Sequence, residues 1–82
     1  VWIYADGVEQ EIPMAKLQKG DIVVSQMGAM IPIDGEVVDG EAMVNEASFT
    51  GEPLSRRVVK EDTVFAGTLI EEGKLFIKVR TR

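Results

Sequence analysis

The chain has 82 residues, of which 45% are hydrophobic and 28% charged, and its formal net charge is −5. This length and balance predict that residues 1–82 form a single folded domain with a small core, and they argue against disorder. The absence of cysteine and histidine excludes disulfides, thiol nucleophiles and a Ser-His-Asp triad, and the acidic charge argues against nucleic-acid binding.

The chain is predicted to begin with a β-hairpin. Residues 1–5 are β-branched and aromatic, and residues 8–12 resume an alternating pattern. Between them stands Asp6-Gly7, a typical two-residue hairpin turn. Pro13 then interrupts the strand pattern.

The middle of the chain predicts short elements separated by turns. "MAKLQKG" at 14–20 offers one short helical or 3₁₀ turn that stops at Gly20. Residues 21–25 are apolar at three consecutive positions, which favours a strand covered on both faces. After a loop, two further short strands are expected on either side of Gly40, at 36–39 and 42–46.

The second half predicts four more strands, at 57–60, 63–66, 68–71 and 74–81, with turns at 61–62 and 72–73. No stretch shows helical periodicity over three turns. Many short strands with frequent turn signals indicate a mainly β fold of the barrel, sandwich or jelly-roll type, with at most one short helical turn. The lysines and arginines at alternate positions of the last strand are expected to face water.

"SFTGEP" at 48–53 is the strongest candidate for a functional turn. Gly51 permits backbone conformations that are closed to other residues, and Pro53 restricts Glu52 toward extended geometry. A carboxylate that projects from such a turn can orient a water molecule and accept its proton. The alternative is that Thr50-Gly51-Glu52 only connects two strands, because a tripeptide alone is a weak signal.

Two other patterns carry less weight. The acidic residues of "DGEVVDGE" at 34–41 lack the spacing and the terminal bidentate glutamate of a calcium-binding EF-hand loop. "GEAMV" at 40–44 resembles the lysine-bearing hairpin of biotinyl and lipoyl carrier domains, which would make the chain a carrier or adaptor without catalytic activity. Val44 stands where such a carrier has its modified lysine, which counts against this alternative.

Four stretches together resemble, in order and spacing, the actuator domain of P-type ATPases, and most closely that of the heavy-metal-transporting branch. They are "DGVEQEIPMAKLQKGDIVV", "GAMIPIDGEVVDG", "VNEASFTGEP" and "DTVFAGT", and they cover almost the whole chain. The resemblance implies a distorted jelly roll, or double-stranded β-barrel-like domain, on the cytoplasmic side of an integral membrane pump. Both ends of the chain then look like cuts in a longer protein.

The resemblance also implies the roles of the candidate residues. Glu52 would position the water that hydrolyses an aspartyl-phosphate intermediate on another domain, and Thr50 and Gly51 would shape the turn. No cofactor or metal is expected in this domain, whereas ATP and Mg²⁺ are implied for the full pump, and the transported cation would bind elsewhere. The expected partners are the phosphorylation and nucleotide-binding domains and the membrane helices of the same polypeptide, with the isolated domain a monomer.

Three positions near the turn bear on the subfamily and on the local packing. Pro53 stands where many P-type pumps have serine, and the heavy-metal branch often has proline there. Asn45 replaces a common aspartate, and Ser55-Arg56 stands where Pro-Val is usual. The last departure leaves open how the chain packs as it leaves the turn.

Overall fold

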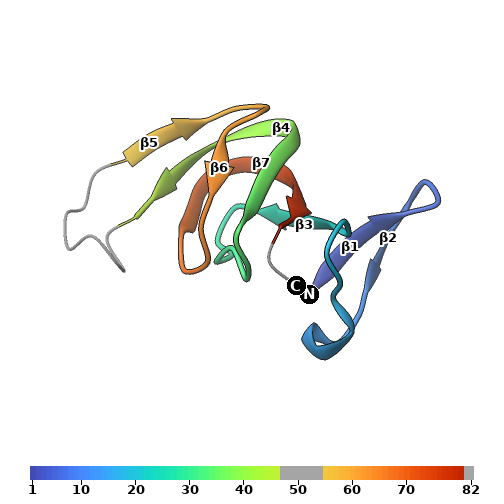
Figure 1. Cartoon of the computed structure of the whole chain (residues 1–82). Coiled ribbons are helices and arrows are strands. Elements are labelled where there is room, and N and C mark those ends of the chain that lie inside the picture. The colour runs from blue at the N-terminus through green and yellow to red at the C-terminus, as the bar shows by residue number, and fades with distance from the viewer. Residues whose placement is uncertain (47–54, 81–82) are drawn as a thin grey trace.

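The computed structural model describes residues 1–46 and 55–80. In this part of the chain one antiparallel sheet has the strand order β2-β1-β3-β7-β4-β5, with β6 paired to β4. The sheet curves around its own core (Figure 1). The elements are β1 Trp2–Ala5, β2 Val8–Glu11, the 3₁₀ turn η1 Met14–Lys16, β3 Ile22–Gln26, β4 Gly35–Asn45, β5 Ser55–Val58, β6 Thr63–Val64 and β7 Leu69–Val79. The predicted mainly β fold with one short helical turn is confirmed.

The N-terminal hairpin forms as predicted. Ala5 of β1 lies opposite Val8 of β2, so that Asp6 and Gly7 make a two-residue turn. Their φ angles are 53° and 80°, and positive φ at both central residues is the mark of a type I′ turn. All four residues of β2 are exposed.

Strands β4 and β7 differ from the prediction, because each is one continuous strand of 11 residues. They pair from Gly35 opposite Val79 to Asn45 opposite Leu69. The predicted breaks at Gly40 and at 72–73 are therefore wrong. Both glycines lie within the paired region and have positive φ, 86° at Gly40 and 96° at Gly73.

The two glycines permit a close approach of the long strands. A Cβ atom on Gly73 would meet the carbonyl oxygen of Glu41 and would lie 2.8 Å from the Cα of Ala42. A Cβ on Gly40 would meet the carbonyl oxygen of Lys74. The register between β4 and β7 shifts between Val37 and Asp39 and again between Met43 and Val44, and such shifts bend a sheet locally. Gly40 and Gly73 therefore allow the two strands to bend, and neither glycine ends its strand.

The next two strands differ from the prediction in position or in length. β5 starts and ends two residues earlier than the expected 57–60, and β6 contains only Thr63–Val64. The turn predicted at 61–62 is present, and Glu61 has a φ of 82°. Asp62 Oδ2 accepts a hydrogen bond of 2.9 Å from the backbone N–H of Val59, which closes this turn.

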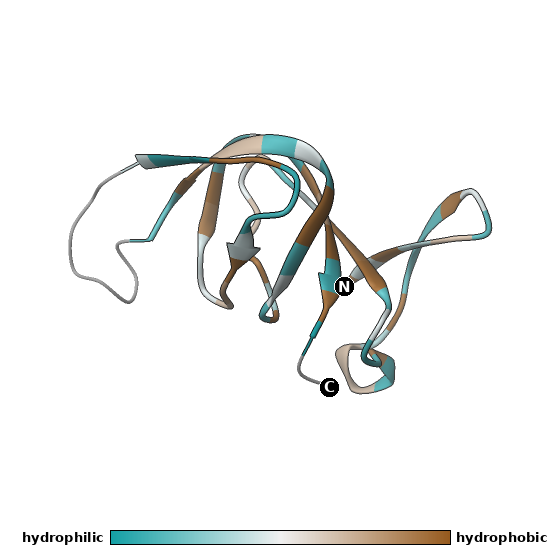
Figure 2. Ribbon diagram, turned by 45° about the horizontal axis from the view of Figure 1, so that its top comes forward, coloured by the Kyte–Doolittle hydropathy of each residue, from teal (hydrophilic) through white to brown (hydrophobic). Residues whose placement is uncertain are grey.

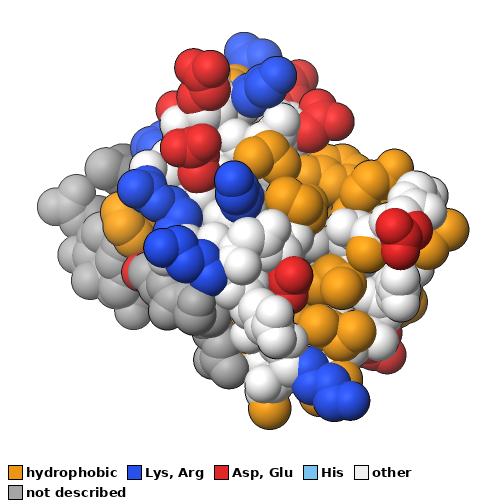
Figure 3. Space-filling model, turned by 45° about the vertical axis from the view of Figure 1, so that its right-hand side comes forward, with side chains coloured by type: hydrophobic (Ala, Val, Ile, Leu, Met, Phe, Trp, Pro, Cys, Tyr) orange, Lys and Arg blue, Asp and Glu red, His pale blue; other side chains and the backbone are white. Residues whose placement is uncertain are grey.

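A single aliphatic core lies on the inner side of the curved sheet. Figure 2 shows hydrophobic residues alternating with polar ones along the strands. Val23 and Val24 are both buried, which confirms that β3 is covered on both faces. Outside the core, hydrophobic side chains also gather on one half of the face drawn in Figure 3. The core residues are Leu17, Val23, Ile31, Ile33, Val37, Ala42, Val44, Val58, Val64, Ile70, Leu75, Ile77 and Val79.

Candidate functional site

The predicted catalytic residues Thr50, Gly51 and Glu52 lie outside the described residues. The structure describes the two strands between which they stand in the sequence. β4 ends at Asn45 and β5 begins at Ser55, and these two residues lie opposite each other in the antiparallel pair. The two strands meet at one end of the domain, far from the β1–β2 hairpin (Figure 1). We call this pair of strand ends the loop base.

The hydrophobic core anchors the two strands that form the loop base. Val44 of β4 and Val58 of β5 are both fully buried. β4 also pairs with β7 on its other side, where Asn45 lies opposite Leu69. The end of β4 is thus fixed by hydrogen bonds on both edges and by a buried side chain.

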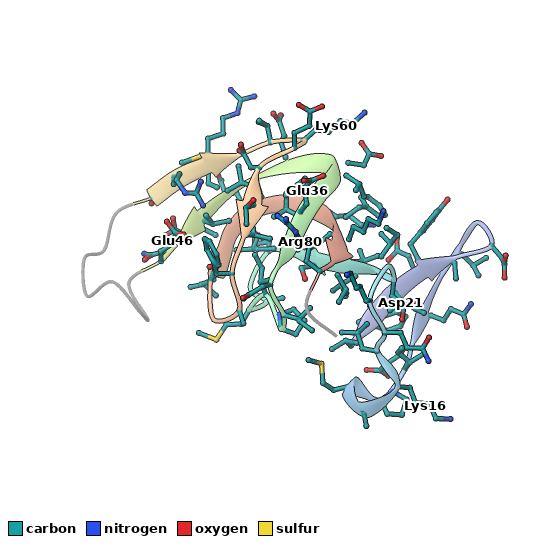
Figure 4. The ribbon with its side chains drawn as sticks, viewed as in Figure 1. Lys16, Asp21, Glu36, Glu46, Lys60 and Arg80 are labelled. Carbon is teal, nitrogen blue, oxygen red and sulfur yellow. The ribbon has the colours of Figure 1, made fainter. Side chains whose placement is uncertain are left out.

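Polar side chains close the loop base at the surface. Arg56 Nε donates to Glu46 Oε1 at 3.2 Å, and Arg56 Nη2 donates to Glu46 Oε2 at 3.3 Å. This is a bidentate pair, the geometry in which an arginine and a carboxylate restrain each other most. Ser55 Oγ donates to Glu71 Oε1 of β7 at 2.5 Å. Figure 4 shows Glu46 at the end of β4.

These contacts answer the question left by Ser55-Arg56. Ser55 has its carboxylate partner on β7 and Arg56 has its partner in the residue that follows β4, so they link the start of β5 to β7 and to the end of β4. The sequence reasoning missed the pair between Glu46 and Arg56. The signal was present, because the two residues stand at equal distances on either side of Gly51, where a hairpin would bring opposite charges together.

A second, more exposed pair lies further along the same two strands. Arg57 Nη2 donates to Glu41 Oε2, and both side chains are more than half exposed. The hydrogen bond to Glu41, together with the charge of that carboxylate, raises the pKa of Arg57 above its ordinary value. This shift lies in the direction that favours the charged guanidinium, which an arginine already holds at neutral pH.

Two of the acidic residues at 34–41 accept hydrogen bonds from backbone N–H groups. Asp34 Oδ1 accepts from the N–H of Ala66 at 2.8 Å, and Asp39 Oδ1 accepts from the N–H of Gly40 at 2.9 Å. No three His, Cys, Asp or Glu side chains gather as a potential metal site within residues 1–46 and 55–80. In the same part of the chain, no helix is long and apolar enough to cross a membrane.

The carrier alternative is wrong. It required the position of Val44 to lie at the tip of an exposed hairpin, whereas Val44 is fully buried within β4. All 82 residues match the family model of the P-type ATPase actuator domain. The chain belongs to that family. The resemblance drawn from the four sequence stretches is confirmed.

Relatives of this actuator domain transport heavy metals according to their names. It is 40% identical over 76 residues to a probable copper-exporting P-type ATPase of Archaeoglobus fulgidus, with 93% of this chain and 10% of that protein covered. It is 41% identical over 76 residues to a probable cadmium-transporting ATPase of Listeria monocytogenes, with 93% of this chain and 11% of that protein covered. The actuator domain thus spans about a tenth of the length of these relatives.

A solved structure has the same fold. The crystal structure of a zinc-transporting PIB-type ATPase in the E2.Pi state matches with a TM-score of 0.91, over 99% of this chain and 13% of that one. The sequence identity is 23%, so this match concerns the fold alone. Together with the family match, it shows that the curved sheet around the loop base is the actuator fold.

Proposed function

We propose that residues 1–82 are the actuator domain of an ATP-driven heavy-metal cation pump, and that Glu52 promotes hydrolysis of its aspartyl-phosphate intermediate. The relatives named for copper and cadmium transport support the class of cargo, and Pro53 is consistent with this branch. The main support for the site is the loop base. There, β4 and β5 present the two ends of the Thr-Gly-Glu segment opposite each other, on strands fixed by the core and by Glu46 and Arg56.

In the proposed reaction a water oxygen attacks the phosphorus of the aspartyl phosphate, and the bond between phosphorus and the aspartate oxygen breaks. Glu52 accepts a proton from the water, so that phosphate and a free aspartate carboxylate result. Thr50 and Gly51 shape the turn that carries Glu52. Such phosphoryl transfer depends mainly on placing an in-line nucleophile, which a carboxylate on a well-anchored turn can do.

The remaining parts of the pump belong to the same proposal. ATP and Mg²⁺ act at the phosphorylation and nucleotide-binding domains, and the cation binds among membrane helices. The actuator domain works on the cytoplasmic side of the membrane, where its movement couples dephosphorylation to those helices. The 82 residues alone are expected to hydrolyse no ATP, since they lack an Asp-Lys-Thr-Gly-Thr phosphorylation motif.

The decisive experiment is Glu52→Gln in the full pump, because this change keeps the size of the side chain and removes its proton-accepting charge. Phosphorylation from ATP is expected to persist, while dephosphorylation slows by about 10²- to 10⁴-fold, the usual effect of losing a general base. Phosphoenzyme therefore accumulates. The measurement is the decay of radiolabelled phosphoenzyme after a chase with unlabelled ATP.

Two further variants serve as comparisons in the same assay. Thr50→Ala is expected to slow the decay in the same direction through the shape of the turn. Glu46→Gln is expected to do much less, because Glu46 contacts Arg56 at the loop base and has no part in the proton transfer. If the Glu52→Gln pump loses its phosphate at the parent rate, Thr-Gly-Glu is only a connection between strands.

A further inference from the structure

A second feature lies at the opposite end of the long strands. A cleft of about 430 Å³ is lined by Lys19, Gly20, Glu36, Lys78, Val79 and Arg80. Glu36 is near the start of β4, whereas the loop base is at its end, so the two places are about 30 Å apart along the strand at ~3.3 Å per residue. Figure 4 shows Glu36 and Arg80 close together at this end. The cleft is separate from the Thr-Gly-Glu segment.

The walls of the cleft are fixed by backbone hydrogen bonds. Glu36 lies opposite Lys78 in the pairing of β4 with β7. The N–H of Gly20 donates to the carbonyl of Val79 at 3.0 Å, and the N–H of Val79 donates to the carbonyl of Asp21 at 2.9 Å. Cations from the segment before β3 and from the end of β7 are therefore held on a preformed frame.

The charges of the cleft are unbalanced. Within residues 1–46 and 55–80, the ion pairs engage Arg56, Arg57 and Lys74. None of them engages the three cations of the cleft, which share it with one carboxylate. This local excess of positive charge stands out on a chain whose net charge is −5. A concave surface of one charge sign concentrates its field and attracts a counter-ion.

We propose that this cleft binds a phosphate-bearing anion. A phosphate group is compact, carries up to two negative charges, and offers several acceptor oxygens to an arginine fork and to lysine ammonium groups. A volume of about 430 Å³ is that of a small-molecule site, whereas a protein segment would need a longer groove. An anionic lipid headgroup and a free phosphate compound share this chemistry. Glu36 opposes binding through its negative charge and so limits the affinity.

The test uses the 82-residue chain and its backbone amide NMR spectrum. The probes are inorganic phosphate, glutarate as a dicarboxylate control, and phosphatidylcholine vesicles with or without phosphatidic acid. Inorganic phosphate is expected to shift the amide signals of Gly20 and of residues 78–80, with a dissociation constant of about 1 mM at low salt. Glutarate is expected to bind more weakly, because its two carboxylates are too far apart to act as one compact anion.

Three variants assign the binding to the cleft. Lys78→Gln is expected to weaken phosphate binding by about fivefold, the effect of losing one exposed ion pair. Glu36→Gln is expected to strengthen it by a similar factor. Lys60→Gln is the matched control, because Lys60 is an exposed lysine outside the cleft, and it should leave binding unchanged. The parent-like spread of amide signals shows that each variant is folded.

The outcomes test whether the cleft binds phosphate and whether a lipid headgroup is the source. Binding of both inorganic phosphate and phosphatidic-acid vesicles supports recognition of the phosphate group itself. Binding of these vesicles alone, lost in Lys78→Gln, supports a lipid headgroup as the natural source. The proposal is overturned if no amide of the cleft shifts with either phosphate probe, if glutarate binds as tightly as phosphate, or if Lys60→Gln weakens binding as much as Lys78→Gln.

Discussion

The cations at the two ends of the β4–β7 pair have different surroundings. At and next to the loop base, Arg56 and Arg57 each contact a carboxylate of β4 or of the residue that follows it. At the other end, Lys78 and Arg80 line an open cleft and engage no carboxylate in the described ion pairs. A paired cation restrains the strands that it joins, whereas an unpaired cation is available to a ligand. Along the same two strands, the arginines at one end restrain the sheet, while the cations at the other end remain available for the proposed anion.

The largest effect on stability is expected from a substitution at Gly73, where β4 and β7, the strands that join the two ends, approach each other closely. Gly73→Ala places a methyl group against the backbone of Glu41 and Ala42 at a φ of 96°. Strain from the positive φ and the steric overlap together are expected to lower the free energy of unfolding by about 3 kcal/mol. Denaturant unfolding of the 82-residue chain measures the loss.

Gly28→Ala is the matched control for this change. Gly28 has a similar φ of 87°, but a Cβ there would meet nothing within 4 Å. The control is thus expected to cost about 1 kcal/mol, which is the conformational term alone. Equal losses in the two variants would mean that the close approach of β4 and β7 contributes nothing.

An intermediate effect is expected from reversing charge at the loop base. In the full pump, Arg56→Glu places two carboxylates together and should slow phosphoenzyme decay by about fivefold to tenfold. The double variant Arg56→Glu with Glu46→Arg restores an opposite-charge pair and should recover most of the rate. A double variant as slow as Arg56→Glu would show that the identity of Arg56, rather than its pairing, matters.

The smallest effect is expected from the exposed pair. Arg57→Gln should leave the unfolding midpoint unchanged, because Arg57 and Glu41 are both largely exposed and screened by water. The raised pKa of Arg57 would favour the folded state below the ordinary arginine pKa and lose that effect only as pH rises through the raised value. The unfolding midpoints of parent and variant should therefore agree at about pH 6 and also at about pH 9. A difference that changes between these pH values would contradict this assignment.

Much of the fold could be predicted because its signals are local. Asp6-Gly7 predicts the first hairpin, since both residues tolerate positive φ, and Pro13 correctly separates it from η1. Gly40 and Gly73 misled the prediction for the same reason. A glycine is read as a turn signal, and only the pairing of β4 with β7 reveals that each glycine faces a neighbouring backbone.

The candidate site also has a part that could be predicted from the sequence and a part that depends on strand pairing. The Thr-Gly-Glu stretch and its family could be identified from contiguous residues. The pair between Glu46 and Arg56 could have been predicted from the opposite charges on either side of Gly51, and the β4–β5 pairing brings the two residues together. The partner of Ser55 could not be assigned, because Glu71 lies on β7, away from the Thr-Gly-Glu stretch. Likewise, Lys78 and Arg80 were expected only to face water, and their meeting with Lys19 depends on how β3 and β7 pair.

The edge strands of the sheet bear on self-association. β2 and β5 are its two ends, and each offers free backbone hydrogen-bonding groups that could recruit another strand. β2 carries Glu9 and β5 carries Arg56 and Arg57, so the edges of two copies would attract each other and extend into a continuous sheet. Lys74 binds Glu9 at 2.6 Å, and the two arginines are neutralised by carboxylates of their own chain. These internal pairs lower the charge that the two edges present to each other, and we expect them to oppose edge-to-edge association of two copies.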